Sequence, residues 1–306
     1  MQMFNNHDGS TGRISTSKGN QVKMEVDGYW YKMDYLGYEG LAEYLACELL
    51  AYTNIPVYAE YEITEISLNG QKFNGCRSKD FLKKNEEIVT ADRLFKKYAG
   101  CSVSDFLKRN PSASLQEKIR SFVTEVENLT KIPDYGKYLT KMLEWDEFIL
   151  NDDRHFNNIA FVYNSGTDRF SICTLFDNGA GFLSDTRFDY PLQKDIYGMS
   201  ANVKAKSFSE SFSKQTEACR KLYGTQLQIA DNICIPKYVE EKMRSQYGNK
   251  VTDRICEIFS HQKYLLEEYL YPSKDSVLDS LIRETEEDCE KISPPNKREQ
   301  DPDISI

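Results

Sequence analysis

The segment 150–182 constrains the fold of this chain more than any other stretch of its sequence. It contains two β-rich runs, 158–163 and 170–176, which are separated by a polar, glycine-containing connection. Such a pattern predicts a β-hairpin. Because a hairpin returns the chain to its starting point, we expect Asp177, directly after the second run, to lie near the loop that precedes the first. The polar residues of that loop are Asp153, His155 and Asn158.

Two carboxylates and an amide that are held together in this way suit phosphoryl transfer. Asn158 and Asp177 offer oxygen ligands for Mg²⁺, which binds nucleotide phosphates. Asp153 can orient or deprotonate an attacking hydroxyl. Taken singly, each feature has a simpler explanation, since an Asp pair before Arg is commonly a helix cap and Asn-Gly is commonly a turn. The order of Asp, Asn, hairpin and Asp-x-Gly together favours the functional interpretation.

The pattern D-R-H-x-x-N from Asp153, then two strands, then D-x-G from Asp177, resembles the catalytic loop and metal motif of HipA-like atypical serine/threonine protein kinases. The phosphoinositide lipid kinases share the D-R-H-x-x-N spacing. The resemblance implies an α+β, two-lobed protein-kinase-like fold, with a small antiparallel sheet and one helix in the first lobe and a mainly helical second lobe. It implies ATP and Mg²⁺, with Asp153 as base, Asn158 and Asp177 on the metal, and His155 either stabilising phosphate charge or bracing the loop.

A segment rich in Gly, Ser and Thr, residues 8–20, precedes a hairpin predicted at 21–33. Glycine-rich loops beside strands can hold phosphate through backbone N–H groups. We interpret the segment as a nucleotide-covering loop, and a flexible chain end is the simpler alternative. In some members of the HipA-like family a Ser in this region becomes autophosphorylated, and the candidates here are Ser15 and Ser17. The predicted loop residues are Gly9, Ser10, Thr11 and Gly12.

Lys32 lies in the second strand of that hairpin, and Glu43 lies at the margin of the apolar face of a helix predicted over 39–52. A surface Lys and a solvated Glu are the ordinary interpretations. The HipA-like family places its phosphate-binding Lys on such a strand, shortly before a helix that carries a Glu. The resemblance therefore implies an ion pair between Lys32 and Glu43.

The helix predicted over 138–150 carries Asp146 in the middle of its apolar face. A buried carboxylate is costly unless it is hydrogen-bonded. We therefore expect Asp146 to bind backbone amides of the following loop. Beyond the hairpin, residues 183–210 carry few regular signals, and in kinases this position holds the segment that positions a protein substrate. Lys204 and Lys206 belong to this segment and could contact substrate or phosphate, but neither is assigned to the site.

These elements predict a first lobe at 1–84, with the chain crossing at 78–85, where adenine would stack. Residues 85–292 are expected to form the helical lobe with the catalytic loop and metal motif. Its helices are predicted at roughly 90–110, 114–128, 138–150, 211–223, 236–247, 249–271 and 274–292. The Pro-rich, charged residues 293–306 are expected to be a disordered tail.

Composition and charge limit the classes of partner, metal site and cellular compartment that the sequence favours. The net charge of −9 argues against general nucleic-acid or anionic-membrane binding. No apolar run is long enough for a transmembrane helix, and the polar N-terminus does not look like a signal peptide. The 8 Cys form no C-x-x-C pair and the chain has 3 His, so we expect free thiols in a reducing cytoplasm and no zinc site. Delivery into a host cell and an inhibitory partner protein are left open.

We therefore predict an ATP-dependent kinase that transfers the γ-phosphoryl group to Ser or Thr hydroxyls of a protein substrate and also phosphorylates itself. A phosphoinositide-type lipid kinase is an alternative, because the loop spacing is shared. A non-catalytic nucleotide-binding regulator is another, and transfer of AMP in place of phosphate is a third.

Overall fold

The computed structural model describes residues 2–4, 14–16 and 22–270 of the 306-residue chain. Ser15 belongs to a strand in this part. Four predictions lie outside the described residues: the loop from Gly9 to Gly12, the candidate Ser17, the helix at 274–292 and the tail at 293–306.

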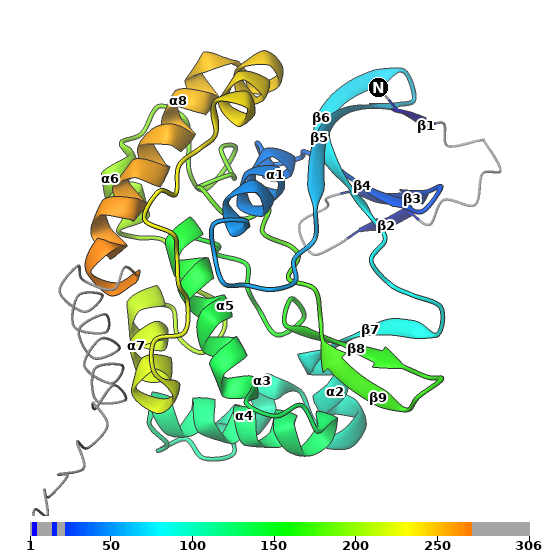
Figure 1. Ribbon diagram of the computed structural model, residues 1–306, viewed down its shortest axis with the longest axis vertical. Helices are drawn as coiled ribbons and strands as arrows, with labels where there is room; N and C mark the ends of the chain where they lie inside the picture. The colour runs from blue at the N-terminus through cyan, green and yellow to red at the C-terminus, as the bar shows by residue number, and fades with distance from the viewer. Residues whose placement is uncertain (1, 5–13, 17–21, 271–306) are drawn as a thin grey trace, which may run out of the picture. The chain divides into compact units, whose positions relative to one another are not determined.

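The first part of the described chain forms a six-stranded sheet in the order β1-β5-β6-β4-β3-β2 (Figure 1). Neighbouring strands are antiparallel, as predicted, except that the edge strand β1 runs parallel to β5. Two hairpin turns, Asp27-Gly28 and Asn69-Gly70, have positive φ at both residues, which matches the twist of the flanking strands. The strands are β1 (Gln2–Phe4), β2 (Ile14–Thr16), β3 (Val22–Val26), β4 (Tyr29–Met33), β5 (Tyr61–Leu68) and β6 (Gln71–Lys79).

Helix α1 (Glu39–Leu50) packs against this sheet, and the two together are called the first lobe below (Figure 1). The helix buries nearly every side chain, including Leu41 and Leu45. It approaches β6 at two glycines: a Cβ on Gly40 would lie 2.6 Å from the carbonyl carbon of Gly75. Larger residues would push the helix away from the sheet, and the side chains that reach from α1 toward the sheet would move with it.

Residues 80–85 lead from the first lobe to a three-stranded antiparallel sheet, in the order β7-β8-β9. The hairpin β8 (Ala160–Asn164) and β9 (Arg169–Ile172) confirms the prediction, although β9 ends before residue 176. Strand β7 (Glu86–Thr90) was not predicted, because five residues are too few for alternation to separate a strand from a connecting loop. We call the described residues from β7 onward the second lobe.

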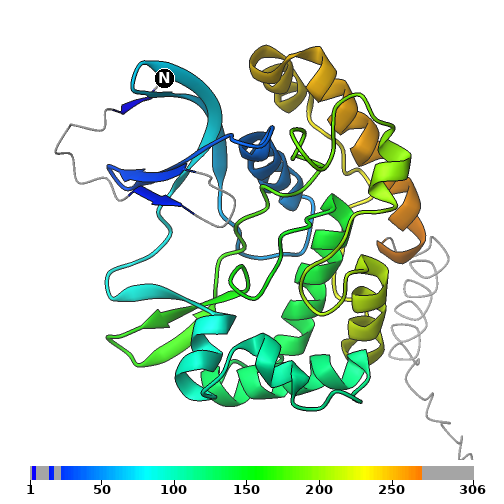
Figure 2. The same cartoon turned by 180° about the vertical axis from the view of Figure 1, so that it is seen from behind.

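Helices make up most of the second lobe, and α5 packs among α4, α7 and α8 (Figure 2). The helix predicted at 90–110 is two helices, because Ser102 caps the start of a second one. The two helices predicted at 236–247 and 249–271 are confirmed: both lie within α8, and Gly248, with non-helical φ of 78° and ψ of 169°, separates them. None of the helices in the described ranges is long and apolar enough to cross a bilayer. The helices are α2 (Ala91–Tyr98), α3 (Val103–Lys108), α4 (Leu115–Thr130), α5 (Tyr135–Ile149), α6 (Ile196–Ser200), α7 (Phe212–Tyr223) and α8 (Lys237–Leu270).

Candidate active site

The loop that follows α5 is fixed by one buried arginine. Arg154 is 2% exposed, and its guanidinium donates to the Asp146 carboxylate on α5 (Nε to Oδ2, 2.9 Å). The same group donates to the carbonyl oxygens of Asn158 (3.2 Å) and Phe176 (2.7 Å) and to the side-chain oxygen of Asn178 (2.9 Å). These contacts join helix, loop and the end of the hairpin, so the residue after Phe176 is held beside the loop.

Asp146 holds the loop as we expected, but through different groups. We predicted that its carboxylate would bind backbone amides, whereas it binds the Arg154 guanidinium and the side-chain amide of Asn151 (2.9 Å). Asp146 is fully buried. A guanidinium fork neutralises such a charge as well as hydrogen-bonding it, which backbone amides do not. Burial alone would lower the pKa of Arg154, but Asp146 raises it above its usual value.

The structure brings the predicted loop and metal residues to one cavity of about 450 Å³, which Asp153, His155, Asn158 and Asp177 all line. The side-chain nitrogen of Asn158 donates to the carbonyl of Asp153 (2.9 Å), which leaves its amide oxygen as the group that can ligate. Asp177 has φ of 60°, in the left-handed region that Asp adopts more readily than most residues.

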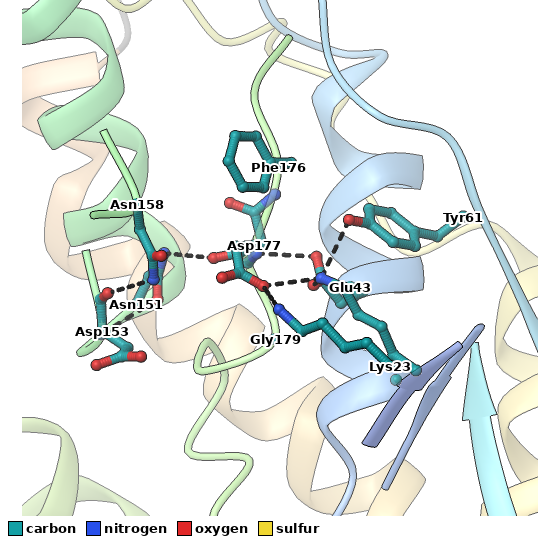
Figure 3. A network of polar contacts seen from close by, with 12 residues as sticks. Lys23, Glu43, Tyr61, Asn151, Asp153, Asn158, Phe176, Asp177 and Gly179 are labelled. Atoms are coloured by element: carbon teal, nitrogen blue, oxygen red, sulfur yellow. Dashed lines mark hydrogen bonds and ion pairs between the residues drawn. The ribbon is translucent and has the colours of Figure 1, made fainter. Parts of the chain in front are cut away.

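A buried ionic network connects Asp177 to the first lobe (Figure 3). The Lys32 ammonium pairs with Glu43, lies 2.8 Å from Asp177 Oδ1, and donates to the Tyr61 hydroxyl at 3.3 Å. Lys23 lies 3.4 Å from the same Asp177 oxygen. Burial alone would lower the pKa of Lys32, but Asp177 and Glu43 raise it well above its usual value. Burial alone would raise the pKa of Asp177, but Lys32 and Lys23 hold it well below its usual range. Both groups are therefore charged at neutral pH.

Glu43 contacts a second group besides Lys32. Its second carboxylate oxygen accepts a hydrogen bond from the backbone N–H of Asn178 (2.8 Å), so α1 holds the residue directly after Asp177. Sequence reasoning paired Lys32 with Glu43 but did not find this contact. It also missed Lys23. The register of the predicted hairpin could have identified this residue, because it places Lys23 opposite Lys32.

The start of α1 is held by the second lobe. Asp34 accepts hydrogen bonds from the backbone N–H of Gly40 (2.5 Å) and from the Tyr247 hydroxyl of α8 (2.8 Å). Burial, together with the neighbouring Glu39, raises the pKa of Asp34 to about 7. The position of α1, and with it that of Glu43, therefore depends on a carboxyl group that titrates near neutral pH.

The side of the cavity beyond Asp153 is lined by residues that sequence reasoning did not assign to the site, apart from Lys206, which it left without a role. Lys206 Nζ lies 2.8 Å from Asp153 Oδ1. Tyr190 donates to Asp152 Oδ2, and burial raises the pKa of Asp152 to about 6. Tyr190 and Lys206 come from the 183–210 segment, which has few regular signals, so only the folded chain shows that they face the loop.

No protein-family model and no curated protein matches this sequence. Among solved structures, the chain is similar to the crystal structure of CtkA, a proinflammatory kinase of Helicobacter pylori, with a TM-score of 0.55 and 16% identity over 83% of this chain and 93% of that one. The fold is therefore kinase-like. A second alignment, with a choline/ethanolamine kinase family protein from Mesorhizobium loti, spans 85% of this chain and 90% of that one at 11% identity. Its TM-score of 0.22 is too low to indicate a shared fold.

The donor groups that line this cavity fit Mg²⁺. Among residues 2–4, 14–16 and 22–270, no group of three or more His, Cys, Asp or Glu side chains is placed to hold a metal. Mg²⁺ does not need one, because it usually binds one or two carboxylates and completes its shell with phosphates and water. An ionised Asp177 and the amide oxygen of Asn158, on one cavity, are such a set.

Proposed function

We propose that this chain is an ATP-dependent phosphotransferase, and specifically a HipA-like serine/threonine protein kinase. The observation that carries the proposal is the network of Lys32, Glu43 and Asp177. Its Asp177 lines the same cavity as Asp153 and Asn158. A structural ion pair alone would not need a cavity beside it, nor a second carboxylate and an amide on its wall. The kinase-like fold supports the same reading.

The residues take distinct roles in the proposed reaction. Lys32 binds the α- and β-phosphates of ATP, and Glu43 keeps Lys32 in place while its other oxygen holds Asn178. Asp153 orients the acceptor hydroxyl and takes its proton. Asn158 and Asp177 would hold Mg²⁺, which supplies positive charge to the phosphates. Catalysis of this kind depends on positioning and electrostatics, which agrees with a site fixed by buried ion pairs.

Incubation of the chain with γ-labelled ATP and cell lysate, followed by mass-spectrometric mapping, tests the proposal. We expect label on Ser or Thr, and a loss of about 10²-fold or more in Asp153→Asn, because the base is removed. Asp168→Asn is a matched control, since Asp168 lies in the exposed β8–β9 turn and is outside the cavity. Equal labelling by wild type and Asp153→Asn would contradict the proposal.

The alternatives give different results in the same assay. Label from α-labelled ATP would indicate AMP transfer, and label on phosphoinositide vesicles in place of protein would indicate a lipid kinase. Nucleotide binding without transfer of any label would indicate a regulator. Each of these outcomes would replace the protein-kinase proposal, and no contact in the described chain favours one of them over it.

A further inference from the structure

The cavity beside Asp153 is strongly acidic. Its lining, in the described part of the chain, includes six carboxylates and a single Lys or Arg side chain, which is that of Lys206. A phosphoryl group in transfer carries negative charge, and carboxylates close to it are unfavourable unless cations compensate them. Lys32 and Lys23 supply positive charge at Asp177. The carboxylates are Glu39, Asp152, Asp153, Asp177, Asp185 and Asp189.

Lys206 supplies the cation on the Asp153 side. Its ammonium lies 2.8 Å from Asp153 Oδ1, and the two side chains are 52% and 33% exposed, so both remain accessible from the cavity. Burial alone would lower the pKa of Lys206, but Asp153 raises it above its usual value. The cation therefore stays charged beside the group proposed as base.

The backbone on both sides of Lys206 is anchored. Ala205 is 3% exposed, and the Ser207 hydroxyl donates to the carbonyl oxygen of Arg154 in the catalytic loop. The ring of Phe208 packs edge-on against Phe156, with centroids 5.2 Å apart. Because these neighbours are anchored, the segment holds Lys206 on the cavity wall, whereas a lysine on an unanchored surface loop would not be held in this way.

We propose that Lys206 is a catalytic residue that binds the transferring phosphoryl group next to Asp153. The inference rests on the proposed function. In the transfer the acceptor oxygen bonds to the γ-phosphorus, and the bond from that phosphorus to the β,γ-bridging oxygen breaks. ADP leaves with the electron pair of that bond. The acceptor proton passes to Asp153 and then to solvent. Lys206 neutralises charge on the phosphoryl oxygens while this occurs.

The test compares Lys206→Ala, Lys206→Arg and Lys204→Ala in steady-state assays with γ-labelled ATP. Lys204 is a matched control, because it lies two residues away in the same segment, pairs with Glu210 (2.8 Å), and is outside the cavity lining. We expect Lys206→Ala to lower kcat by about 10²-fold with a small change in KM for ATP, as for other single groups that stabilise transition-state charge. Lys206→Arg should recover at least about tenfold of that loss, and Lys204→Ala should match wild type.

Several outcomes would overturn the inference. A Lys206→Ala enzyme as fast as wild type would show that the lysine does not take part in catalysis. A faster enzyme would show that the lysine blocks access to Asp153. Equal losses in Lys206→Ala and Lys206→Arg, or a matching drop in melting temperature, would indicate a structural role. Each of these results leaves the kinase proposal standing, whereas a wild-type chain that transfers no phosphate removes both proposals.

Discussion

Replacing Asp146 with Ala removes the carboxylate that neutralises Arg154 inside the second lobe. The two side chains are 0% and 2% exposed, so the guanidinium would remain buried without its counter-ion. Breaking a buried pair by deleting one partner costs about 3–5 kcal/mol, because the remaining charge stays desolvated. Asn151 would lose a hydrogen-bond partner as well. For a chain of this size, that loss lowers the melting temperature by roughly 6–20 °C.

Equilibrium urea unfolding of Asp146→Ala measures this loss. The matched control is Glu62→Ala, which breaks an ion pair of similar length (2.6 Å) with Arg77 at positions that are 61% and 37% exposed. Exposed pairs contribute about 0–1 kcal/mol. If Asp146→Ala costs no more than Glu62→Ala, the assignment of the Asp146–Arg154 pair as the element that fixes the loop is wrong.

A double-mutant cycle sharpens the result. Replacing Arg154 with Met in the Asp146→Ala background removes the stranded charge, so the double variant should be more stable than the sum of the two single losses by about 2 kcal/mol. It should not regain activity, because Arg154 also binds the carbonyls of Asn158 and Phe176. Additive losses would indicate that the two residues stabilise the lobe independently.

Two further predictions concern α1. Glu43→Gln should lower kcat by about 10²-fold while the chain stays folded, because a neutral amide holds Lys32 less firmly than a carboxylate does. Assays with γ-labelled ATP measure this loss, and full activity would contradict the role given to Glu43. Asp34 has a pKa raised from 3.8 to about 7, so the folded state binds more protons than the unfolded state, and stability should fall as pH rises through about 4–7, by roughly 4 kcal/mol at most. Asp34→Asn should flatten that part of the profile of melting temperature against pH; an unchanged slope would show that another group is responsible.

Local sequence patterns were sufficient for the hairpins, for helix α1 and for the short-range part of the site, but not for strand β7. The Asp27-Gly28 and Asn69-Gly70 turns set hairpins by their own backbone preferences, and the β8–β9 hairpin follows from two β-rich runs around a glycine-containing connection. That hairpin explains why Asp177 lies on the same cavity as Asp153. Turn preferences and the spacing of hydrophobic residues depend on a few neighbouring residues, so the sequence alone is enough to recognise them.

The sequence could not give contacts that depend on how separate elements pack. Glu43 binds the backbone of Asn178, and Lys206 lies against Asp153, although no pattern connects these positions along the chain. The same holds for the choice of partner by Asp146, since a buried carboxylate requires a compensating group without specifying which one.

The sequence by itself therefore determined which local turns bring Asp153, Asn158 and Asp177 together, and it indicated these residues as candidates for the proposed phosphoryl transfer. The tertiary structure decided which further charges neutralise one another: Lys32 with Asp177, and Arg154 with Asp146. The physical reason is that the cost of a charge depends on burial and on the distance to its counter-ion. Both quantities exist only after the two lobes and their connecting segments have packed.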